Sequence, residues 1–146
     1  MARDLAATWE LLTAVTRARQ QLASARPLIW EKARLPTSEH TQIVKASAAG
    51  ERWSRTNNGA DQVVMQVSVE TLLKDGRRLA SCLDIVASPQ HWTTQPYITL
   101  GGQQLIWEGS ASQREDPAGL AESVDSAARS LLDATMKVDF TQLDEQ

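Results

Sequence analysis

The side chains that most often carry proton transfer or metal binding are few in this chain. His40 and His91 are the two histidines, and Cys82 is the single cysteine. A general base or a zinc site would most easily recruit one of these groups. Glu39 directly precedes His40, so the pair lacks the i, i+4 spacing of ligands on one helix face. The pattern therefore assigns no catalytic residue, no metal ligand and no cofactor.

Cys82 and Asp84 share one face of a predicted strand. A reactive thiol needs an electropositive setting, and a neighbouring carboxylate disfavours the thiolate, so we interpret Cys82 as a small apolar side chain. Asp84 interrupts an otherwise apolar row. Asp84 is either a buried, hydrogen-bonded carboxylate or part of a sheet face whose middle is exposed to solvent, and we favour the solvent-exposed (wet) face.

Tryptophan is abundant beside one tyrosine and one phenylalanine. The five copies are Trp9, Trp30, Trp53, Trp92 and Trp107. Tryptophan buries a large area and carries one N–H donor, so it suits both cores and interface anchors. We expect Trp9, on the apolar stripe of a helix, and Trp107, on a strand, to lie in the core.

Trp92 stands in a different setting, because residues 88–96 are polar and contain two prolines. We interpret them as a loop in which Trp92 either folds back onto the core or contacts a partner. Trp30 lies in an apolar segment, residues 28–30, that we expect to be a short strand or an extended arm. The residues expected to contact a partner protein are Trp92, His91, Trp30, Gln95 and Tyr97.

The elements that would position these side chains begin and end with helices. Residues 1–26 carry a stripe of residues at helical spacing, and Pro27 is expected to end this helix. This stripe comprises Leu5, Trp9, Leu12, Val15 or Thr16, Arg19 and Leu22. Residues 116–138 form the second helix, with Asp116 as N-cap and an apolar stripe. The stripe comprises Leu120, Val124, Ala127, Ala128, Leu131 and Thr135 or Met136. Residues 139–146 form an acidic tail.

Between the helices, residues 41–109 alternate apolar and polar side chains with period two, which indicates half-buried strands. A three-residue loop, Lys74–Gly76, keeps the apolar faces in phase and pairs Val67 with Leu83. Asn57-Asn58-Gly59 predicts another hairpin, and Gly101-Gly102 a further one.

The strands on either side of Gly101-Gly102 are predicted to pair Ile98 with Leu105. Connections this short make neighbouring strands antiparallel. We therefore predict one α+β domain over residues 1–146: an antiparallel β-meander of about five or six strands, flanked by an N-terminal and a C-terminal α-helix.

Charge and composition exclude several classes of protein. The net charge of −3 and the pI near 5.4 argue against nucleic-acid binding. Residues 1–55 carry a net charge of +4 and the remainder −7, which we interpret as complementarity within the fold. No apolar run reaches the ~20 residues of a membrane span, so we expect no membrane contact. The single cysteine favours a reducing cytoplasm.

Two functions remain open. The first is a small cytoplasmic protein-binding module that neutralises, escorts or regulates a partner protein, as toxin-immunity proteins and secretion chaperones do. The second is a small-molecule-binding domain or enzyme with a pocket between the sheet and the terminal helix, lined by His91, Trp92, Asp84 or Tyr97. An open sheet edge or a helix face would also allow a homodimer.

Overall fold

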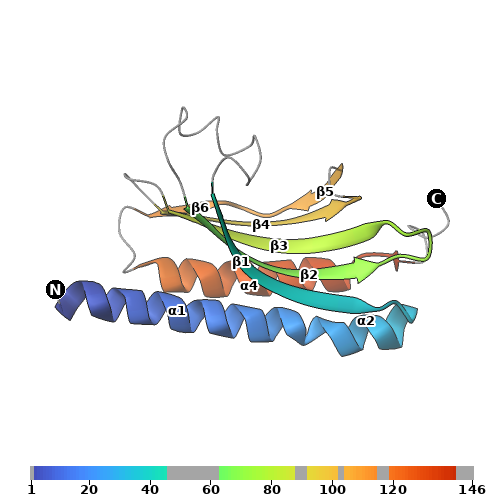
Figure 1. The fold of residues 1–146 in the computed structure, drawn as a ribbon, viewed down its shortest axis with the longest axis horizontal. Helices are drawn as coiled ribbons and strands as arrows, with labels where there is room; N and C mark the ends of the chain where they lie inside the picture. The colour runs from blue at the N-terminus through green and yellow to red at the C-terminus, as the bar shows by residue number, and fades with distance from the viewer. Residues whose placement is uncertain (1, 46–62, 88–91, 102–103, 115–118, 141–146) are drawn as a thin grey trace.

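The computed structural model describes residues 2–45, 63–87, 92–101, 104–114 and 119–140. The N-terminal part holds two helices that follow one another closely (Figure 1). The elements, in chain order, are α1 (Ala2–Ala23), α2 (Ala25–Ala33), β1 (Thr37–Lys45), β2 (Val63–Leu72), β3 (Arg78–Ala87), β4 (Trp92–Leu100), β5 (Gln104–Glu108), β6 (Ser112–Arg114) and α4 (Leu120–Met136). The predicted α+β class is confirmed.

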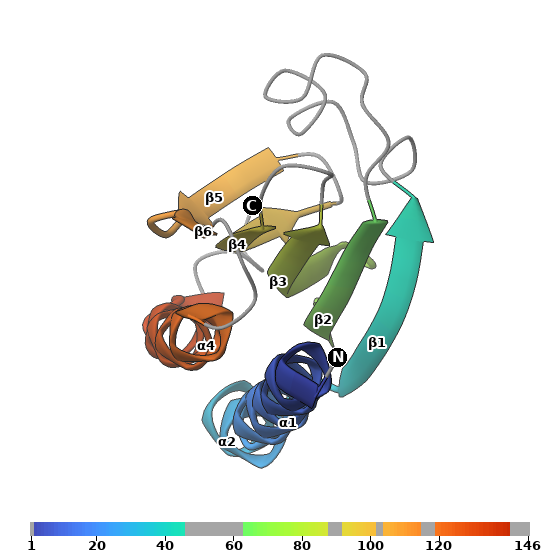
Figure 2. The same ribbon diagram turned by 90° about the vertical axis from the view of Figure 1, so that its left-hand side faces the viewer.

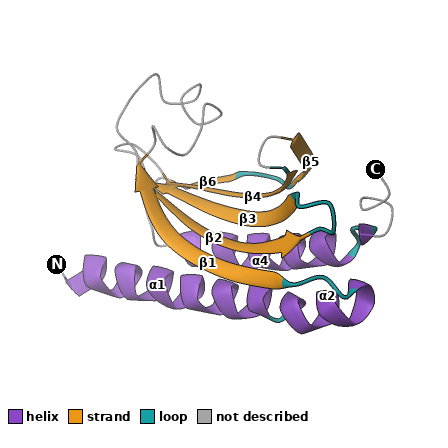
Figure 3. Ribbon diagram, turned by 45° about the vertical axis from the view of Figure 1, so that its right-hand side comes forward, coloured by secondary structure: helices purple, strands orange, loops and turns teal. Residues whose placement is uncertain are grey.

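The six strands form one antiparallel sheet in the order β1-β2-β3-β4-β5, and β6 pairs with β4 beyond the end of β5. All the helices lie on the same side of this sheet (Figure 2). Figure 3 shows α1 and α4 running along the strands beneath it. The molecule thus has two layers, and one sheet face is without a helix among the described residues.

The β2–β3 hairpin has the predicted register. Val67 lies opposite Leu83 and Met65 opposite Ile85. The Leu73 amide donates to the Arg77 carbonyl at 2.9 Å, so residues 74–76 form the loop, and Gly76 has a φ of +92°. Glycine is the residue that adopts this left-handed conformation without strain.

The β4–β5 hairpin differs from the prediction. Ile98 lies opposite Trp107, not Leu105, and Leu105 lies opposite Thr99. Three residues separate β4 from β5, and the register shifts between Ile98 and Thr99. The expected loop of residues 88–96 is also wrong from Trp92 onward, because β4 begins there. The predicted hairpin at Asn57-Asn58-Gly59, with Trp53, lies outside the described residues.

The N-terminal helix breaks at Ser24 and resumes as α2, so the expected strand or arm around Trp30 is wrong. Pro27 is the third residue of α2. An N–H group at this position has no acceptor within the helix, so the proline loses no hydrogen bond there and does not end the helix. α2 ends at Arg34, whose φ of 58° is left-handed and whose amide donates to the Trp30 carbonyl at 2.7 Å. β1 then begins at Thr37, before residue 41, where we expected the sheet to start.

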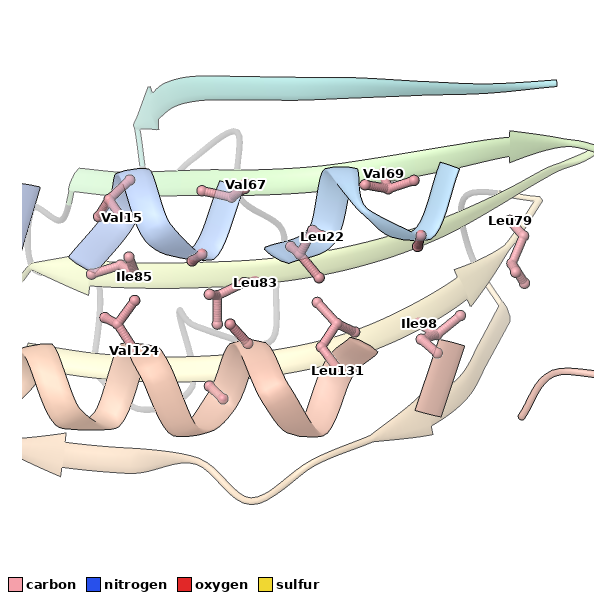
Figure 4. Close-up of a cluster of buried hydrophobic side chains, with 14 of the residues drawn as sticks. Val15, Leu22, Val67, Val69, Leu79, Leu83, Ile85, Ile98, Val124 and Leu131 are labelled. Carbon is pink, nitrogen blue, oxygen red and sulfur yellow. The ribbon is translucent and has the colours of Figure 1, made fainter. Parts of the chain in front are cut away.

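The core lies between the sheet and the helices. Figure 4 shows Val67, Leu83 and Ile85 of the sheet pointing toward Val15 of α1 and Val124 of α4. The predicted stripe of α4 is buried. That of α1 is confirmed at Val15 and Leu22 and wrong at Trp9, Leu12 and Arg19, which are exposed. The buried residues of α1 are Leu11, Ala14, Val15, Ala18 and Leu22.

Trp9 lies on the opposite side of α1 and is 73% exposed. The small side chains of Ala14 and Ala18 face the core instead, and small residues there permit close packing of α1.

The C-terminal helix begins at Leu120 with Gly119 as N-cap, later than the expected start, and Asp116 lies outside the described residues. The expected acidic tail also includes a core residue, since Phe140 is buried. Lys32 Nζ donates to the carbonyls of Met136 and Val138, at 2.8 and 3.1 Å. This contact fixes α2 against the end of α4. Within the described residues, no helix is long and apolar enough to cross a membrane.

Candidate functional site

The helix-free face of the sheet carries two rows of polar side chains, each running across neighbouring strands. Successive side chains of a strand point to opposite faces. Cys82 and Asp84 therefore point away from the core, and so do the residues that lie opposite them on the neighbouring strands. The first row is Gln42, Gln66, Asp84 and Gln95, and the second is His40, Ser68, Cys82, Tyr97 and Glu108.

Asp84 is the centre of a hydrogen-bond network on this face. Its carboxylate is 1% exposed, so the expected wet face is wrong here. Gln66 Nε2 donates to Oδ1 at 2.9 Å and the Tyr97 hydroxyl donates to Oδ2 at 3.0 Å. Gln42 extends the network by donating to Gln66 Oε1 at 3.1 Å. A buried carboxylate is stable when its oxygens accept hydrogen bonds in this way.

The network limits what Tyr97 can do chemically. Burial raises the pKa of Tyr97, and the neighbouring Cys82 and Asp84 raise it further. The hydroxyl therefore keeps its proton and acts as a donor, not as a base. We interpret the Asp84 network as a link between strands β1 to β4, not as a reaction centre.

The five residues expected to contact a partner do not come together. Tyr97 lies on the helix-free face, whereas Trp92 points to the helix side and packs, partly buried, against the core. Trp30 lies on α2 and is 50% exposed. Gln95 is buried, and His91 lies outside the described residues.

Trp92 thus follows the first of the two alternatives, folding back onto the core. The expected lining of a pocket facing the terminal helix is wrong for Asp84 and Tyr97, because both point away from α4.

Three of the tryptophans line hollows on the protein surface. Trp30 stands beside Pro27 and Pro36 in a hollow of about 550 Å³. Trp9 lines a smaller one of about 290 Å³ between α1 and α4. Trp107 lines the third, also about 550 Å³, between β5 and α4.

The Trp30 hollow has a wall fixed by hydrogen bonds. Arg26 Nε donates to the Thr37 hydroxyl at 3.2 Å, and its Nη2 donates to the Thr37 carbonyl at 3.1 Å. The Arg34 guanidinium lies 5.8 Å from the centre of the Trp30 ring. These contacts tie α2 to β1 and to its own C-cap.

The third hollow, which we call the β5–α4 groove, combines an apolar floor with a polar rim. Its lining residues are Ile98, Ile106, Trp107, Ser130, Asp133, Ala134, Lys137, Val138 and Asp139. On the rim, Lys137 Nζ lies 3.0 Å from Asp133 Oδ2. Hollows of roughly 300–1,000 Å³ with apolar walls and a few polar groups are typical binding sites.

The irregular register of β5 produces the apolar wall of this groove. Trp107 lies opposite Ile98 and Leu105 opposite Thr99, so Ile106 is an extra residue without an opposite partner on β4. Such a bulge turns a side chain out of the regular alternation. As a result, the consecutive residues Ile106 and Trp107 both line the groove.

Trp107 is held in place by the chain that follows β5. A Cβ atom added at Gly109 would lie 2.8 Å from Pro96 Cγ and 2.8 Å from Trp107 Cη2, so the indole packs where only glycine leaves room. Gln95 Nε2 donates to the Gly109 carbonyl at 2.7 Å and to the Pro96 carbonyl at 3.0 Å. Gln95 is therefore a positioning residue behind the groove wall, not a surface contact.

Strand β5 also offers backbone groups along its outer edge. Among the described residues, β5 pairs with β4 alone. The Gly109 amide donates to the Pro96 carbonyl at 3.0 Å. Backbone groups alternate in direction along an antiparallel strand, so those of Glu108 point away from β4. The β5–α4 groove thus opens beside backbone donors and acceptors.

Sequence reasoning missed this groove, although it named Gln95 and placed Trp107 on a strand. In the described part of the chain, no three His, Cys, Asp or Glu side chains gather as metal ligands would. The fold and site define an antiparallel sheet with helices on one face and a groove between an edge strand and the terminal helix. Comparison with protein-family models, curated proteins and solved structures found no match.

Proposed function

We propose that this protein is a protein-binding module that takes an extended segment of its partner onto the edge of β5. The observation that supports this proposal is the position of the β5–α4 groove beside the outward backbone groups of Glu108. A strand added to a sheet edge gains main-chain hydrogen bonds, and a pocket next to the edge selects one of its side chains. Both parts of such a site lie together here.

The lining of the groove indicates which kind of side chain would enter it. Ile98 is fully buried at the floor, and Ile106 and Trp107 are partly exposed on the strand side. An apolar side chain of the partner would remove apolar surface from water on both molecules. Aromatic residues at such positions are frequent sources of binding energy.

Binding at one groove suits a module that neutralises, escorts or regulates its partner. Each of these roles needs a specific contact and no reaction centre. The rigidity of the site supports this interpretation, because Gln95 and Gly109 fix the indole before any partner arrives. A preformed site orders fewer groups on binding, which favours affinity.

A small molecule in the same groove is the second candidate. The volume of about 550 Å³ suits a metabolite, and Ser130 with the Asp133–Lys137 pair would supply polar contacts. Native mass spectrometry of the purified protein tests this candidate. A bound molecule that is lost in Ser130→Phe but kept in Ser126→Phe would favour it over a peptide ligand.

The test of the proposed function is selection from a displayed library of random peptides long enough to form a strand. Selected peptides should bind the wild type and lose at least tenfold in affinity toward Ser130→Phe, which fills the groove from its exposed rim. Ser126→Phe is the matched control, because Ser126 is exposed on the same helix and does not line the groove. Peptides that bind all three proteins equally, or a library without binders, would contradict the proposal.

A further inference from the structure

We infer that two copies of this protein associate through the edge of β1, which pairs with the same strand of the second copy in antiparallel orientation about Gln42. This inference does not depend on the proposed function, because β1 and β5 lie at opposite borders of the sheet (Figure 2). The groove beside β5 stays open in both copies.

The edge of β1 lacks several of the features that usually protect a border strand. Short length, proline, a bulge or a covering segment keeps such strands from pairing with other chains. β1 has nine residues (Thr37–Lys45) without proline, and its register with β2 is unbroken. Ser38, His40, Thr41 and Gln42 are exposed. Among the described residues, β1 pairs with β2 alone.

The backbone groups that point away from β2 belong to the odd-numbered residues of β1. The Leu72 amide donates to the Pro36 carbonyl at 3.0 Å, and the direction alternates along the strand, so the even-numbered residues bond to β2. Arg26 agrees with this alternation, because its Nη2 donates to the outward carbonyl of Thr37 at 3.1 Å. Since Arg26 occupies this first group, the stretch left for another strand covers residues 39–45.

The middle of this stretch determines the register of the pair. A strand that pairs with its own copy has a two-fold axis at its midpoint, which for residues 39–45 is Gln42. Glu39 then lies opposite Lys45, and Thr41 opposite Ile43. These residues have outward backbone groups in both copies, so each opposite pair exchanges two hydrogen bonds. No like charges stand opposite each other in this register.

Gln42 extends a row of polar side chains to the axis. Its Nε2 donates to Gln66 Oε1 at 3.1 Å, and Gln66 donates to Asp84 in turn. An amide side chain has a second N–H and an acceptor oxygen. At the axis the two Gln42 residues form a non-hydrogen-bonded backbone pair, in which side chains lie close together. The two amides can therefore bond to each other and join the polar rows of both sheets.

A second copy of β1 fits this edge better than β5 does. Pairing of β1 with β5 would leave a free edge at each end, so copies would add without limit. β5 has five residues and a bulge at Ile106, which makes it a shorter and less regular partner. Pairing of β1 with β1 closes after two copies.

Sedimentation equilibrium of the purified protein tests the inference. We expect a species of twice the monomer mass of 16.1 kDa. Thr41→Pro should raise the dissociation constant about tenfold or more, because proline removes an outward N–H and leaves the bonds to β2 intact. Thr41→Val is the matched control, since it keeps the N–H and the branched shape. Circular dichroism checks that both variants are folded.

A charge at the axis gives a second measurement that needs no proline. Gln42→Lys keeps a donor for Gln66 but places two ammonium groups beside each other. The dimer should therefore weaken at low salt and recover at about 1 M salt. Ser38→Lys should have no such effect, because Ser38 is exposed on the same face but lies outside the paired stretch.

Disulfide formation tests the register. Gln42→Cys should link two copies under mild oxidation, because residues opposite each other in a non-hydrogen-bonded pair lie within disulfide distance. His40→Cys should not, since residue 40 lies opposite residue 44, and the native Cys82 is buried. Monomer mass at every concentration would overturn the inference. A dimer that survives both Thr41→Pro and Gln42→Lys, or that is linked by His40→Cys instead of Gln42→Cys, would overturn it as well.

Discussion

The side-chain amide of Gln95 donates a hydrogen bond of 2.7 Å to the carbonyl of Gly109, which lies between the end of β5 and the start of β6. This bond joins a buried residue of β4 to the backbone segment that carries the Trp107 indole. It explains how a short, irregular edge strand keeps a defined groove wall.

Replacing Gln95 with alanine should lower the free energy of unfolding by about 1–3 kcal/mol. The substitution removes the donor to two backbone carbonyls and leaves a space in a buried position. Urea denaturation measures the change, with Gln104→Ala as control, because Gln104 is exposed on β5. Equal unfolding curves for the two variants would show that the Gly109 contact is not stabilising.

Gly109→Ala should displace the Trp107 indole. The new Cβ would lie 2.8 Å from both Trp107 Cη2 and Pro96 Cγ, so one of them must move. We expect a loss of about 1–3 kcal/mol from overpacking and a shifted indole N–H resonance for Trp107. Nuclear magnetic resonance with Trp107→Phe to assign the signal checks this. An unmoved Trp107 resonance would mean that the indole packs elsewhere.

The raised pKa of Tyr97 predicts a loss of stability at alkaline pH. Burial, with Cys82 and Asp84 nearby, raises the pKa above its ordinary value of 10.0. Below that value both states hold the proton and stability is unaffected. Above it the unfolded chain releases the proton and the folded chain retains it. The free energy of unfolding then falls, by up to about 1.4 kcal/mol per pH unit.

Tyr97→Phe should show a shallower fall above pH 10.0, since the replaced ring has no proton to lose. Tyr97 is the single tyrosine, so the ultraviolet absorbance of tyrosinate reports this residue alone. A folded protein that forms tyrosinate at the ordinary pKa would contradict the buried network. The phenylalanine variant also loses a donor to Asp84, which should cost about 1–3 kcal/mol at neutral pH.

Gly76→Val should lower the melting temperature through strain at the β2–β3 loop. Gly76 has a φ of +92°, and a β-branched residue adopts such angles at a cost of about 1–2 kcal/mol or more. Space is not the cause, because a Cβ there would meet no atom within 4 Å. Gly76→Asn should be milder, as asparagine tolerates left-handed angles. An equal effect of both substitutions would point to another cause.

The β2–β3 and β4–β5 hairpins differ in how well their registers can be predicted from the sequence. At the loop that contains Gly76, apolar and polar residues alternate along both strands. A single loop length keeps the apolar faces in phase, and the structure has a loop of this length. At β5, the run Leu105-Ile106-Trp107 is apolar throughout, so alternation specifies no register. The bulge at Ile106 brings Ile106 and Trp107 to the groove beside α4, which is distant in the chain.

The candidate site depends on the same long-range contacts. Gln95 belongs to the polar, proline-bounded segment and Tyr97 directly follows it, and both were expected to contact a partner. Gln95 lies behind the groove and Tyr97 lies in the Asp84 network. The stripe of α1 misled for a related reason. Trp9 and Leu12 fit a helical stripe with Val15 and Leu22 as well as Leu11, Ala14 and Ala18 do, but only the second set is buried with them.

Amide hydrogen exchange along β5 tests the central claim most directly, using a groove-dependent peptide from the display selection. If the peptide adds to the edge of β5, the Glu108 amide, which points away from β4, should become protected on binding. The amides at the β2–β3 loop, such as that of Gly76, should exchange as before. An unchanged Glu108 amide with the peptide bound would contradict strand addition at this edge.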